Sequence, residues 1–303
     1  MNNSMPKISV LLPTYNQAQF IEETLESVLI QNYLNIEIVI GDDGSTDGTR
    51  EILLRYKDNY PNLIKLVLSE KNEGITANCN KILNECTGDF IALFAGDDLW
   101  APNKLNMQMD WFRNNPDAAL CFTKSEVFEN STGRVIATKP DLPLPSQDDV
   151  IEYAFAITAC GPSFLIARWA LPQNGFDKRL SFVSDWLFWI DVLKKGKAGC
   201  LEEVLVKYRR HTQNTSNNFE LIFAEHIMTL CIIENKYPDL VASVGQKRID
   251  KLLHQLDYYL TGGDESIKVN LLKKTLRMNS AKSLFSTIKE EVAYRIKRRL
   301  RSE

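Results

Sequence analysis

Short apolar runs alternate with amphipathic segments through the first third of the chain. The apolar runs cover residues 8–12, 36–40, 64–68 and 90–94, and each ends at a glycine, a proline or a polar turn. Between them, apolar residues recur every three or four positions, as they do on one face of a helix. Nearly continuous apolar runs of this length are typical of strands buried on both faces of a parallel sheet. The alternation predicts a doubly wound α/β sheet.

Beyond residue 102 the pattern mixes further strands and helices. We expect a helix over 102–115, a strand over 119–123, a hairpin turn at 130–133, a strand over 164–167, a helix over 186–193, a strand over 205–208 and a polar loop over 209–216. From Phe219 onward the apolar spacing is helical. The sequence therefore predicts a mixed domain over 1–218 and a helical region over 219–303.

Composition narrows the class of protein. The chain has 303 residues, is 44% hydrophobic and carries a formal net charge of -3, which is ordinary for a soluble globular protein and gives no reason to expect nucleic acid as a partner. No apolar run is long enough to cross a bilayer. The 6 cysteines form no CxxC pair, and no secretory segment precedes the first strand. We expect a cytoplasmic protein with free thiols.

The C-terminal stretch is strongly basic. Residues 268–301 contain 11 Lys or Arg and 2 Glu, and the apolar positions between Leu284 and Leu300 follow one helical stripe. Two interpretations are open. The helix either lies on an anionic membrane surface, or packs its apolar face on the rest of the protein. We favour peripheral contact with the inner face of the cell membrane.

Polar residues gather where the predicted strands end. Thr14 follows the first strand, Asp42 and Asp43 follow the second, and Asp97 and Asp98 follow the fourth. In open α/β sheets, ligands bind beyond the carboxyl ends of the strands. Carboxylate oxygens are the ligands that Mg²⁺ and Mn²⁺ prefer. The sequence predicts a site for an anionic, metal-bound ligand at this edge.

Each acidic pair also has a purely structural interpretation. Asp42 and Asp43 stand before a Gly-Ser turn, where aspartate commonly forms an Asx turn or caps a helix. Asp97 and Asp98 stand shortly before Pro102, a typical helix start. For either pair alone the two interpretations remain open, and their shared position at the sheet edge favours the ligand site.

Six segments in order resemble the inverting glycosyltransferase family 2, which has the GT-A fold. They span 13–16, 42–49, 72–78, 96–102, 175–186 and 208–216. Each motif is weak by itself, but six in this order and spacing are specific. The resemblance covers about residues 7–218, and it implies that this part is a GT-A catalytic domain with 219–303 as a helical appendage.

The resemblance implies transfer of a sugar, with inversion, from a nucleotide-sugar that is most often a UDP-sugar. The acceptor would be a hydroxyl of a cell-surface glycan or a lipid-linked acceptor, and Mg²⁺ or Mn²⁺ would be the cofactor. By position, Asp185 matches the general base, and the metal ligands would be Asp97, Asp98 and His211. The residues expected to bind the nucleotide-sugar are Pro13, Thr14, Tyr15, Asp42, Asp43, Asn72, Gly74 and Asp97.

The chain departs from the family pattern in the acidic motif. Ala95 stands where the family commonly has another aspartate, which leaves open whether Asp97 or Asp98 binds the metal.

His211 has two open interpretations, a metal ligand or a solvated loop residue. Arg209 and Arg210 would face phosphate or lie on the surface. Asp185 would also serve as the N-cap of its helix.

Two other functions stay open at this stage. A nucleotidyltransferase that makes nucleotide-sugars has a related sheet, but typically a Gly-rich, basic first loop, which residues 13–16 do not supply. A transferase-like assembly partner without activity is the second alternative, and Ala95 is its only support.

Overall fold

The structure is a computed structural model that describes residues 5–140, 160–238, 292–294 and 297. The chain divides into two compact units. The first comprises Met1–Lys178 and Phe188–Thr212, and the second comprises Arg179–Leu187 and the part that starts at Gln213. The predicted boundary after residue 218 stays a prediction.

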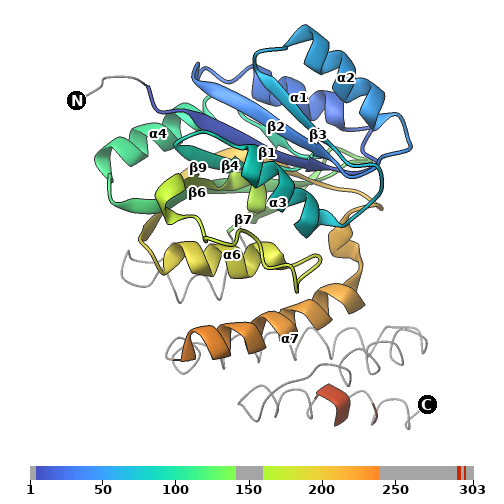
Figure 1. Cartoon of the computed structure of the whole chain (residues 1–303), viewed down its shortest axis with the longest axis vertical. Coiled ribbons are helices and arrows are strands. Elements are labelled where there is room, and N and C mark those ends of the chain that lie inside the picture. Colours follow the sequence, from blue (N-terminus) through green and yellow to red (C-terminus); the bar gives the residue numbers. More distant parts are fainter. Residues whose placement is uncertain (1–4, 141–159, 239–291, 295–296, 298–303) are drawn as a thin grey trace. The chain divides into compact units, whose positions relative to one another are not determined.

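The first unit begins with the parallel half of a nine-stranded sheet (Figure 1). Its strands are β1 (Ile8–Thr14), β2 (Ile36–Asp42), β3 (Ile64–Leu68) and β4 (Phe90–Leu93), joined by the helices α1 (Ile21–Leu29), α2 (Thr49–Asn59) and α3 (Ile75–Glu85). The strand order is β3-β2-β1-β4, and all three pairings are parallel. These elements are the ones that the apolar pattern predicts.

Chain direction explains which helix covers which face. The crossovers from β1 to β2 and from β2 to β3 run the same way along the sheet, whereas β3 to β4 runs back past β1. Because such crossovers are right-handed, α1 and α2 share one face and α3 lies on the other, as Figure 1 shows. The strand order reverses between β1 and β4, which is where such sheets bind ligands.

A close approach fixes α3 on the sheet. Gly41 lies in β2, and a Cβ atom there would stand 2.2 Å from Asn78 Oδ1 and 2.6 Å from the Ile82 side chain. The missing side chain lets Asn78 Nδ2 donate to the Gly41 carbonyl at 2.8 Å. A Cβ atom at position 41 would force the Asn78 and Ile82 side chains to move, so glycine lets α3 pack this tightly against β2.

The second half of the sheet is mixed. It contains β8 (Leu165–Ala167), β6 (Ala118–Glu129), β9 (Lys197–Arg210) and β5 (Leu99–Trp100) in that spatial order after β4, and β7 (Val135–Lys139) pairs with β6 as the predicted hairpin. The sequence pattern did not predict β5, which has two residues.

The predicted polar loop over 209–216 is wrong at its start. Arg209 and Arg210 belong to β9, whose register with β6 continues to the pair Glu129↔Arg210. Arg209 is buried, and its guanidinium carbon lies 5.2 Å from the centre of the Phe20 ring and 4.9 Å from that of Phe128. Aromatic faces thus hold a cation that the sequence alone assigned to a phosphate or to solvent.

The other described helical segments are α4 (Lys104–Asn114), η2 (Gly161–Ser163), η3 (Arg168–Ala170), α6 (Ser184–Leu193), η4 (Thr215–Asn217) and α7 (Phe219–Lys236).

Asn103 is the N-cap residue of α4, so Asp97 and Asp98 do not cap it. Asp185 lies in the first turn of α6, one residue inside the helix rather than before it. The sequence pattern also predicts a helix over 149–155, which lies outside the described residues.

A buried lysine links β5, α4 and η2. Lys104 is fully buried, and its Nζ atom lies 4.2 Å from the centre of the Trp100 ring and donates to Gln108 Oε1 at 2.8 Å. Burial lowers the pKa of Lys104 to about 7. Trp100 Nε1 donates to the Pro162 carbonyl, and Gln108 Nε2 to that of Ser163, each at 2.9 Å. These contacts hold η2 against β5 and α4.

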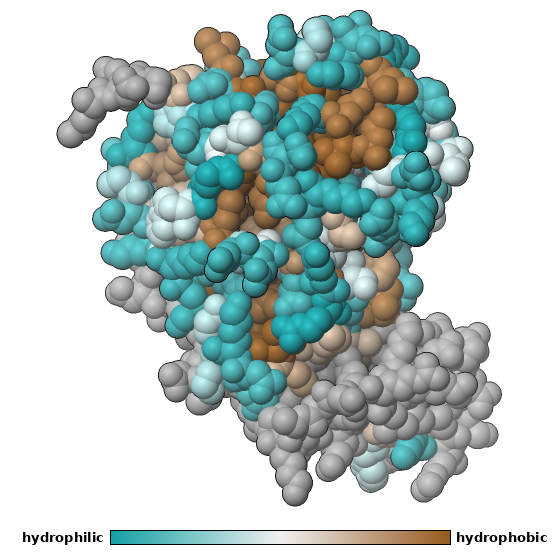
Figure 2. All heavy atoms as spheres, in the orientation of Figure 1, coloured by the Kyte–Doolittle hydropathy of each residue, from teal (hydrophilic) through white to brown (hydrophobic). Residues whose placement is uncertain are grey.

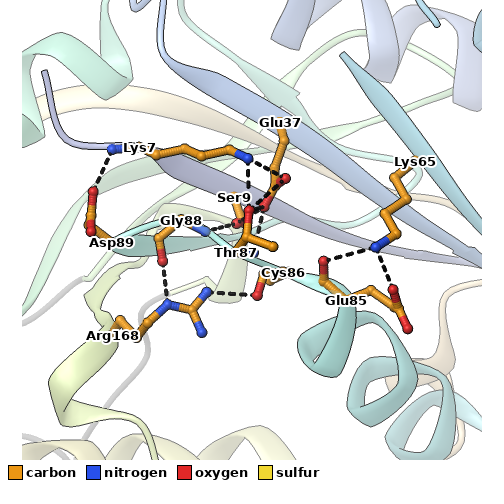
Figure 3. A network of polar contacts seen from close by, with 10 residues as sticks. All are labelled: Lys7, Ser9, Glu37, Lys65, Glu85, Cys86, Thr87, Gly88, Asp89 and Arg168. Carbon is orange, nitrogen blue, oxygen red and sulfur yellow. Dashed lines mark hydrogen bonds and ion pairs between the residues drawn. The ribbon is translucent and has the colours of Figure 1, made fainter. Parts of the chain in front are cut away.

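A polar network lies at the amino ends of β1, β2 and β4, opposite the strand ends that carry the predicted site (Figure 3). The Glu37 carboxylate accepts hydrogen bonds from Lys7 Nζ at 2.7 Å, from the Ser9 hydroxyl and from the Thr87 N–H at 2.6 Å. Burial by itself raises the pKa of Glu37, but these hydrogen bonds outweigh it and lower the pKa to about 2. The network ties the three strands together.

Hydrophilic side chains cover much of the face seen in Figure 2, with apolar groups between them. Among the helices of the described ranges, none is long and apolar enough to cross a membrane. Most of the basic stretch 268–301 lies outside the described residues, so membrane contact through it stays a hypothesis. All 6 cysteines are free thiols.

Candidate active site

The loops that follow β1 and β2 are joined by hydrogen bonds. Asn16 adopts a left-handed conformation with φ 52°, which asparagine tolerates better than most residues. Its N–H donates to Ser45 Oγ at 2.8 Å, and its side-chain oxygen accepts from the Thr46 N–H at 2.9 Å. The Gln17 N–H donates to Thr49 Oγ1 at 2.8 Å. The two loops therefore form one wall at the carboxyl ends of the strands.

Asp42 anchors this wall from inside. Its buried carboxylate accepts a hydrogen bond from Arg50 Nε at 2.8 Å. The same carboxylate forms an ion pair with Arg50 Nη2 at 2.7 Å. The Ser45 N–H points to the same carboxylate at 3.3 Å. This arrangement is the structural interpretation of Asp42, an Asx-type turn reinforced by an arginine.

Asp43 joins the wall to the loop after β3. Its Oδ1 accepts the Glu73 N–H at 2.9 Å, and its Oδ2 accepts the Gly74 N–H at 2.8 Å. The Asn72 side-chain oxygen accepts the same Gly74 N–H at 2.9 Å. A carboxylate oxygen has two lone pairs, so each Asp43 oxygen retains one acceptor position for a ligand. The structure brings together four of the predicted nucleotide-binding residues: Asp42, Asp43, Asn72 and Gly74.

The end of β1 faces the acidic motif across Gly96. A Cβ atom at Gly96 would stand 2.0 Å from Gln17 Oε1 and 3.2 Å from Thr14 Cβ. Both Thr14 Oγ1 and Gln17 Oε1 are buried without a hydrogen-bond partner in the described part of the chain. Two unpaired acceptors beside a glycine are costly unless a ligand or water satisfies them. Pro13 is partly buried, whereas the Tyr15 side chain is 44% exposed.

Asp97 and His211 form a close pair. Asp97 follows β4, His211 follows β9, and Asp97 Oδ2 lies 2.9 Å from His211 Nε2. The side chains are 13% and 9% exposed respectively. The imidazole packs on the Phe20 ring with 4.5 Å between ring centres. The predicted ligands Asp97 and His211 are thus adjacent, and His211 is not a solvated loop residue.

Asp98 points away from this pair into the protein. Its Oδ1 accepts the Arg209 backbone N–H at 2.8 Å, while its buried Oδ2 has no partner among the described residues. Burial, and then the charge of Asp97, raises the pKa of Asp98 well above its ordinary value. Asp98 therefore differs from Asp97 in the direction in which its carboxylate points.

Arg209 holds the acidic motif in place. Its Nε donates to the Asp97 carbonyl at 2.7 Å, and its terminal nitrogens donate to Asn130 Oδ1 at 2.8 Å and to Glu23 Oε2 at 2.6 Å. The planar guanidinium serves three acceptors at once, as only arginine can. Sequence reasoning missed this role. In the sequence, the one indication that Arg209 lies near the acidic motif is its position two residues before the predicted ligand His211.

The donor atoms of Asp97 and His211 suit a divalent cation. A carboxylate and an imidazole are competent ligands for Mn²⁺, and Mg²⁺ is commonly held by one or two carboxylates together with substrate phosphates and water. Within the described ranges, no group of three or more His, Cys, Asp or Glu side chains forms a metal cage. The pair therefore fits a metal that an anionic ligand helps to hold.

The predicted base, Asp185, belongs to the second unit. Its Oδ1 accepts the Trp186 N–H at 2.8 Å. Burial raises the pKa of Asp185 to about 6, and the charge of Glu225 on α7 adds to this rise. A carboxyl with this pKa can take up a proton near neutral pH. Of the other histidines, His226 contacts the Trp186 ring, and His254 lies outside the described residues.

Comparison with known proteins covers both sequence and fold. The family profile described as "Glycosyl transferase family 2" matches residues 9–169. The putative teichuronic acid biosynthesis glycosyltransferase TuaG of Bacillus subtilis is 32% identical over 222 residues, which are 72% of this chain and 84% of TuaG. The putative glycosyltransferase EpsE of the same organism is 36% identical over 143 residues, 47% of this chain, and the match spans about half (51%) of EpsE.

Solved structures resemble the chain over nearly its whole length. S. aureus TarS 1-349 in complex with UDP-GlcNAc matches with a TM-score of 0.64 at 16% identity, covering 98% of this chain and 91% of TarS. The mannosyltransferase PcManGT from Pyrobaculum calidifontis, in complex with GDP-Man and Mn²⁺, matches with a TM-score of 0.61 at 19% identity, covering 96% and 85%. These likenesses confirm the predicted α/β fold of the GT-A type.

Proposed function

The chain belongs to glycosyltransferase family 2, and on this premise we propose that it transfers one sugar from a UDP-sugar, with inversion, to a hydroxyl of a cell-surface glycan or a lipid-linked acceptor. The observation that carries the proposal is the Asp97–His211 pair at the switch point of the sheet. TarS was solved with UDP-GlcNAc, and TuaG is named for teichuronic acid biosynthesis. The TarS complex supports a nucleotide-sugar donor, and the name of TuaG supports a role in polysaccharide biosynthesis.

The nucleotide would lie against the wall built by the loops after β1, β2 and β3. Asp43 has acceptor positions left for the uracil N–H, and Asp42 would act through Arg50 by holding the loop. The unpaired Thr14 hydroxyl would donate to a phosphate oxygen or accept from a ribose hydroxyl. The remaining pocket residues would be Pro13, Tyr15, Asn72 and Gly74.

Mg²⁺ or Mn²⁺ would be held by Asp97 and His211, with the diphosphate of the donor supplying further oxygens. The pairing of GDP-Man with Mn²⁺ in PcManGT supports this cofactor class. When bound, such an ion stabilises the negative charge that develops on the departing nucleotide diphosphate. Asp98 would support the loop from inside, because its Oδ1 is engaged by the Arg209 N–H.

Asp185 would act as the general base. Its carboxylate would take the proton of the acceptor hydroxyl as that oxygen attacks the anomeric carbon from the face opposite the leaving diphosphate. The pKa of about 6 leaves most of the carboxyl deprotonated at pH 7. Its position in the first turn of α6 supplies the Trp186 N–H to orient it.

The test is release of nucleotide from a panel of UDP- and GDP-sugars, including UDP-GlcNAc and GDP-mannose, with and without Mn²⁺. We expect metal-dependent release from one donor and its acceleration by a lipid-linked glycan acceptor. Pyrophosphate formed from a nucleoside triphosphate and a sugar phosphate would contradict transfer and identify a nucleotidyltransferase. Donor binding without turnover would identify a non-catalytic partner.

A further inference from the structure

A buried carboxylate in the second unit binds the backbone of the loop before α6. Glu225 lies on α7 and is buried. Its Oε1 accepts the Ser181 N–H at 2.7 Å, and its Oε2 accepts the N–H groups of Phe182 and Val183 at 2.7 and 2.8 Å. Three consecutive backbone donors therefore converge on one side chain, 42 to 44 residues away in the sequence.

The bound loop leads directly into α6. The helix begins at Ser184, immediately after Val183, and Asp185 is its second residue. The Val183 and Trp186 side chains on either side of this junction are buried, so the junction has little freedom to move. Glu225 itself stands on a helix whose start is fixed by the Asn218 side chain, which accepts the Leu221 N–H at 3.2 Å.

Glu225 also acts on Asp185 through its charge. No cation pairs with Glu225 in the described part of the chain, and its partners are neutral N–H groups. A negative charge near Asp185 disfavours the ionised form of that carboxyl, in addition to the larger effect of burial. On α7 the next residue, His226, faces the Trp186 ring with 5.5 Å between ring centres.

We propose that Glu225 is the positioning residue of Asp185: it fixes the backbone segment that leads into α6 and carries the base. The inference rests on the proposed function, in which Asp185 takes the acceptor proton. A purely structural Glu225 would matter for folding of the loop but not for proton affinity at Asp185. The two roles differ in a measurable way, because charge and reach can be changed separately.

Two variants separate the effect of the Glu225 charge from the effect of its side-chain length. Glu225→Gln keeps the volume but removes the charge and one acceptor oxygen, so at least one of the three N–H groups loses its partner. Glu225→Asp keeps the charge but shortens the side chain by one methylene. The matched control is Glu234→Gln, which removes a partly exposed carboxylate from the same helix. Asp185→Asn reports separately on the base.

The readouts are kcat and the KM of the donor found in the panel, the pH dependence of kcat, and the pKa of Asp185 by carboxyl NMR. In Glu225→Gln we expect kcat to fall on the order of 10- to 100-fold, an unchanged donor KM, and the pKa of Asp185 to fall. In Glu225→Asp we expect a reduced kcat with the pKa still raised. Glu234→Gln should behave as wild type.

Wild-type kcat and an unchanged Asp185 pKa in a folded Glu225→Gln would overturn the inference. If both Glu225 variants fail to fold, hydrogen exchange of the wild-type protein decides. The amides of Ser181, Phe182 and Val183 should exchange as slowly as those of α7, and rapid exchange would overturn the inference. If Asp185→Asn transfers sugar normally, the proposed base is wrong, whatever the Glu225 variants show.

Discussion

Asp97 Oδ2 lies 2.9 Å from His211 Nε2, although the two residues are 114 positions apart in the sequence. The end of β4 and the end of β9 bring them together. The neighbouring Asp98 points the other way and receives the Arg209 N–H. Because the motif lacks an acid at Ala95, this geometry bears directly on the division of labour between the two aspartates. It favours Asp97 for the metal and Asp98 for support of the loop.

The two aspartates should therefore respond differently to the same substitution. We expect Asp97→Asn to lower metal-dependent nucleotide release on the order of 100-fold, because it weakens a ligand of the ion. Asp98→Asn keeps an oxygen for the Arg209 N–H and removes an acid from the interior, so the free energy of unfolding should change by less than about 1 kcal/mol.

Nucleotide release and thermal unfolding of both variants check this. Asp117→Asn is a suitable control, since it is an exposed aspartate distant in sequence from the motif. An Asp98→Asn variant that loses metal dependence while Asp97→Asn retains it would reverse the assignment.

Arg209→Lys should be far from conservative. The lysine keeps the charge but cannot serve the Asp97 carbonyl, Asn130 and Glu23 at the same time. We expect unfolding to become easier by ~2–4 kcal/mol and metal affinity to fall, because the Asp97 loop loses its anchor. Chemical denaturation and Mn²⁺ titration measure the two effects. Arg113→Lys, in an exposed ion pair on α4, is the control and should be near neutral.

The turnover number, kcat, should fall at low pH as Asp185 becomes protonated. The base must be deprotonated to accept a proton, and burial raises its pKa to about 6. We expect kcat to be full above pH 7 and to drop about tenfold for each pH unit below 6. A pH profile of kcat at saturating donor checks this, provided that donor binding is followed separately. A profile that stays flat down to pH 5 would count against Asp185 as the base.

Glu37 should stabilise the sheet in a pH-dependent way. Its folded-state pKa of about 2 lies below the ordinary 4.5, so its contribution is present above pH 4.5 and is lost as the pH falls toward 2. A shift of this size corresponds to about 3 kcal/mol. Glu37→Gln should lower Tm by several degrees at pH 7, and the difference from wild type should shrink by pH 3.

The network in Figure 3 also supplies the matched control for this prediction. Glu85 pairs with Lys65 at the surface, with both side chains nearly half exposed. Exposed pairs contribute little, so Glu85→Gln should leave Tm within about 2 °C. Equal losses in the two variants would mean that burial of Glu37 is not what makes its network effective.

The parallel half of the fold follows from local sequence patterns. The apolar runs around Val10, Ile38, Leu66 and Ala92 predict β1 to β4, because buried parallel strands are recognisable from composition and length. The strand ends then predict which polar residues meet. That Asp42, Asp43 and Asp97 follow strands ending at the same edge of the sheet could be predicted, because this depends only on strand order and direction.

The other half of the site depends on long-range packing that no local pattern reveals. β5 has two residues, too few for any periodicity. From the sequence, Arg209 is a cation expected to face phosphate or solvent, yet the Phe20 and Phe128 rings enclose it. In the sequence, Glu225 is one polar residue among others on a predicted helix. In the structure it accepts hydrogen bonds from a loop more than 40 residues earlier in the chain. Such roles become visible only when distant elements meet.

The central claim is that Asp97 and His211 hold the divalent ion of a nucleotide-sugar site. Pulsed electron paramagnetic resonance of the protein with Mn²⁺ and UDP tests it most directly, because an imidazole nitrogen bound to Mn²⁺ modulates the electron spin echo. We predict nitrogen modulation in the wild type, its loss in His211→Gln, and weak Mn²⁺ binding in Asp97→Asn. Nitrogen modulation that persists unchanged in His211→Gln, or Mn²⁺–UDP binding that is indifferent to both substitutions, would contradict the claim.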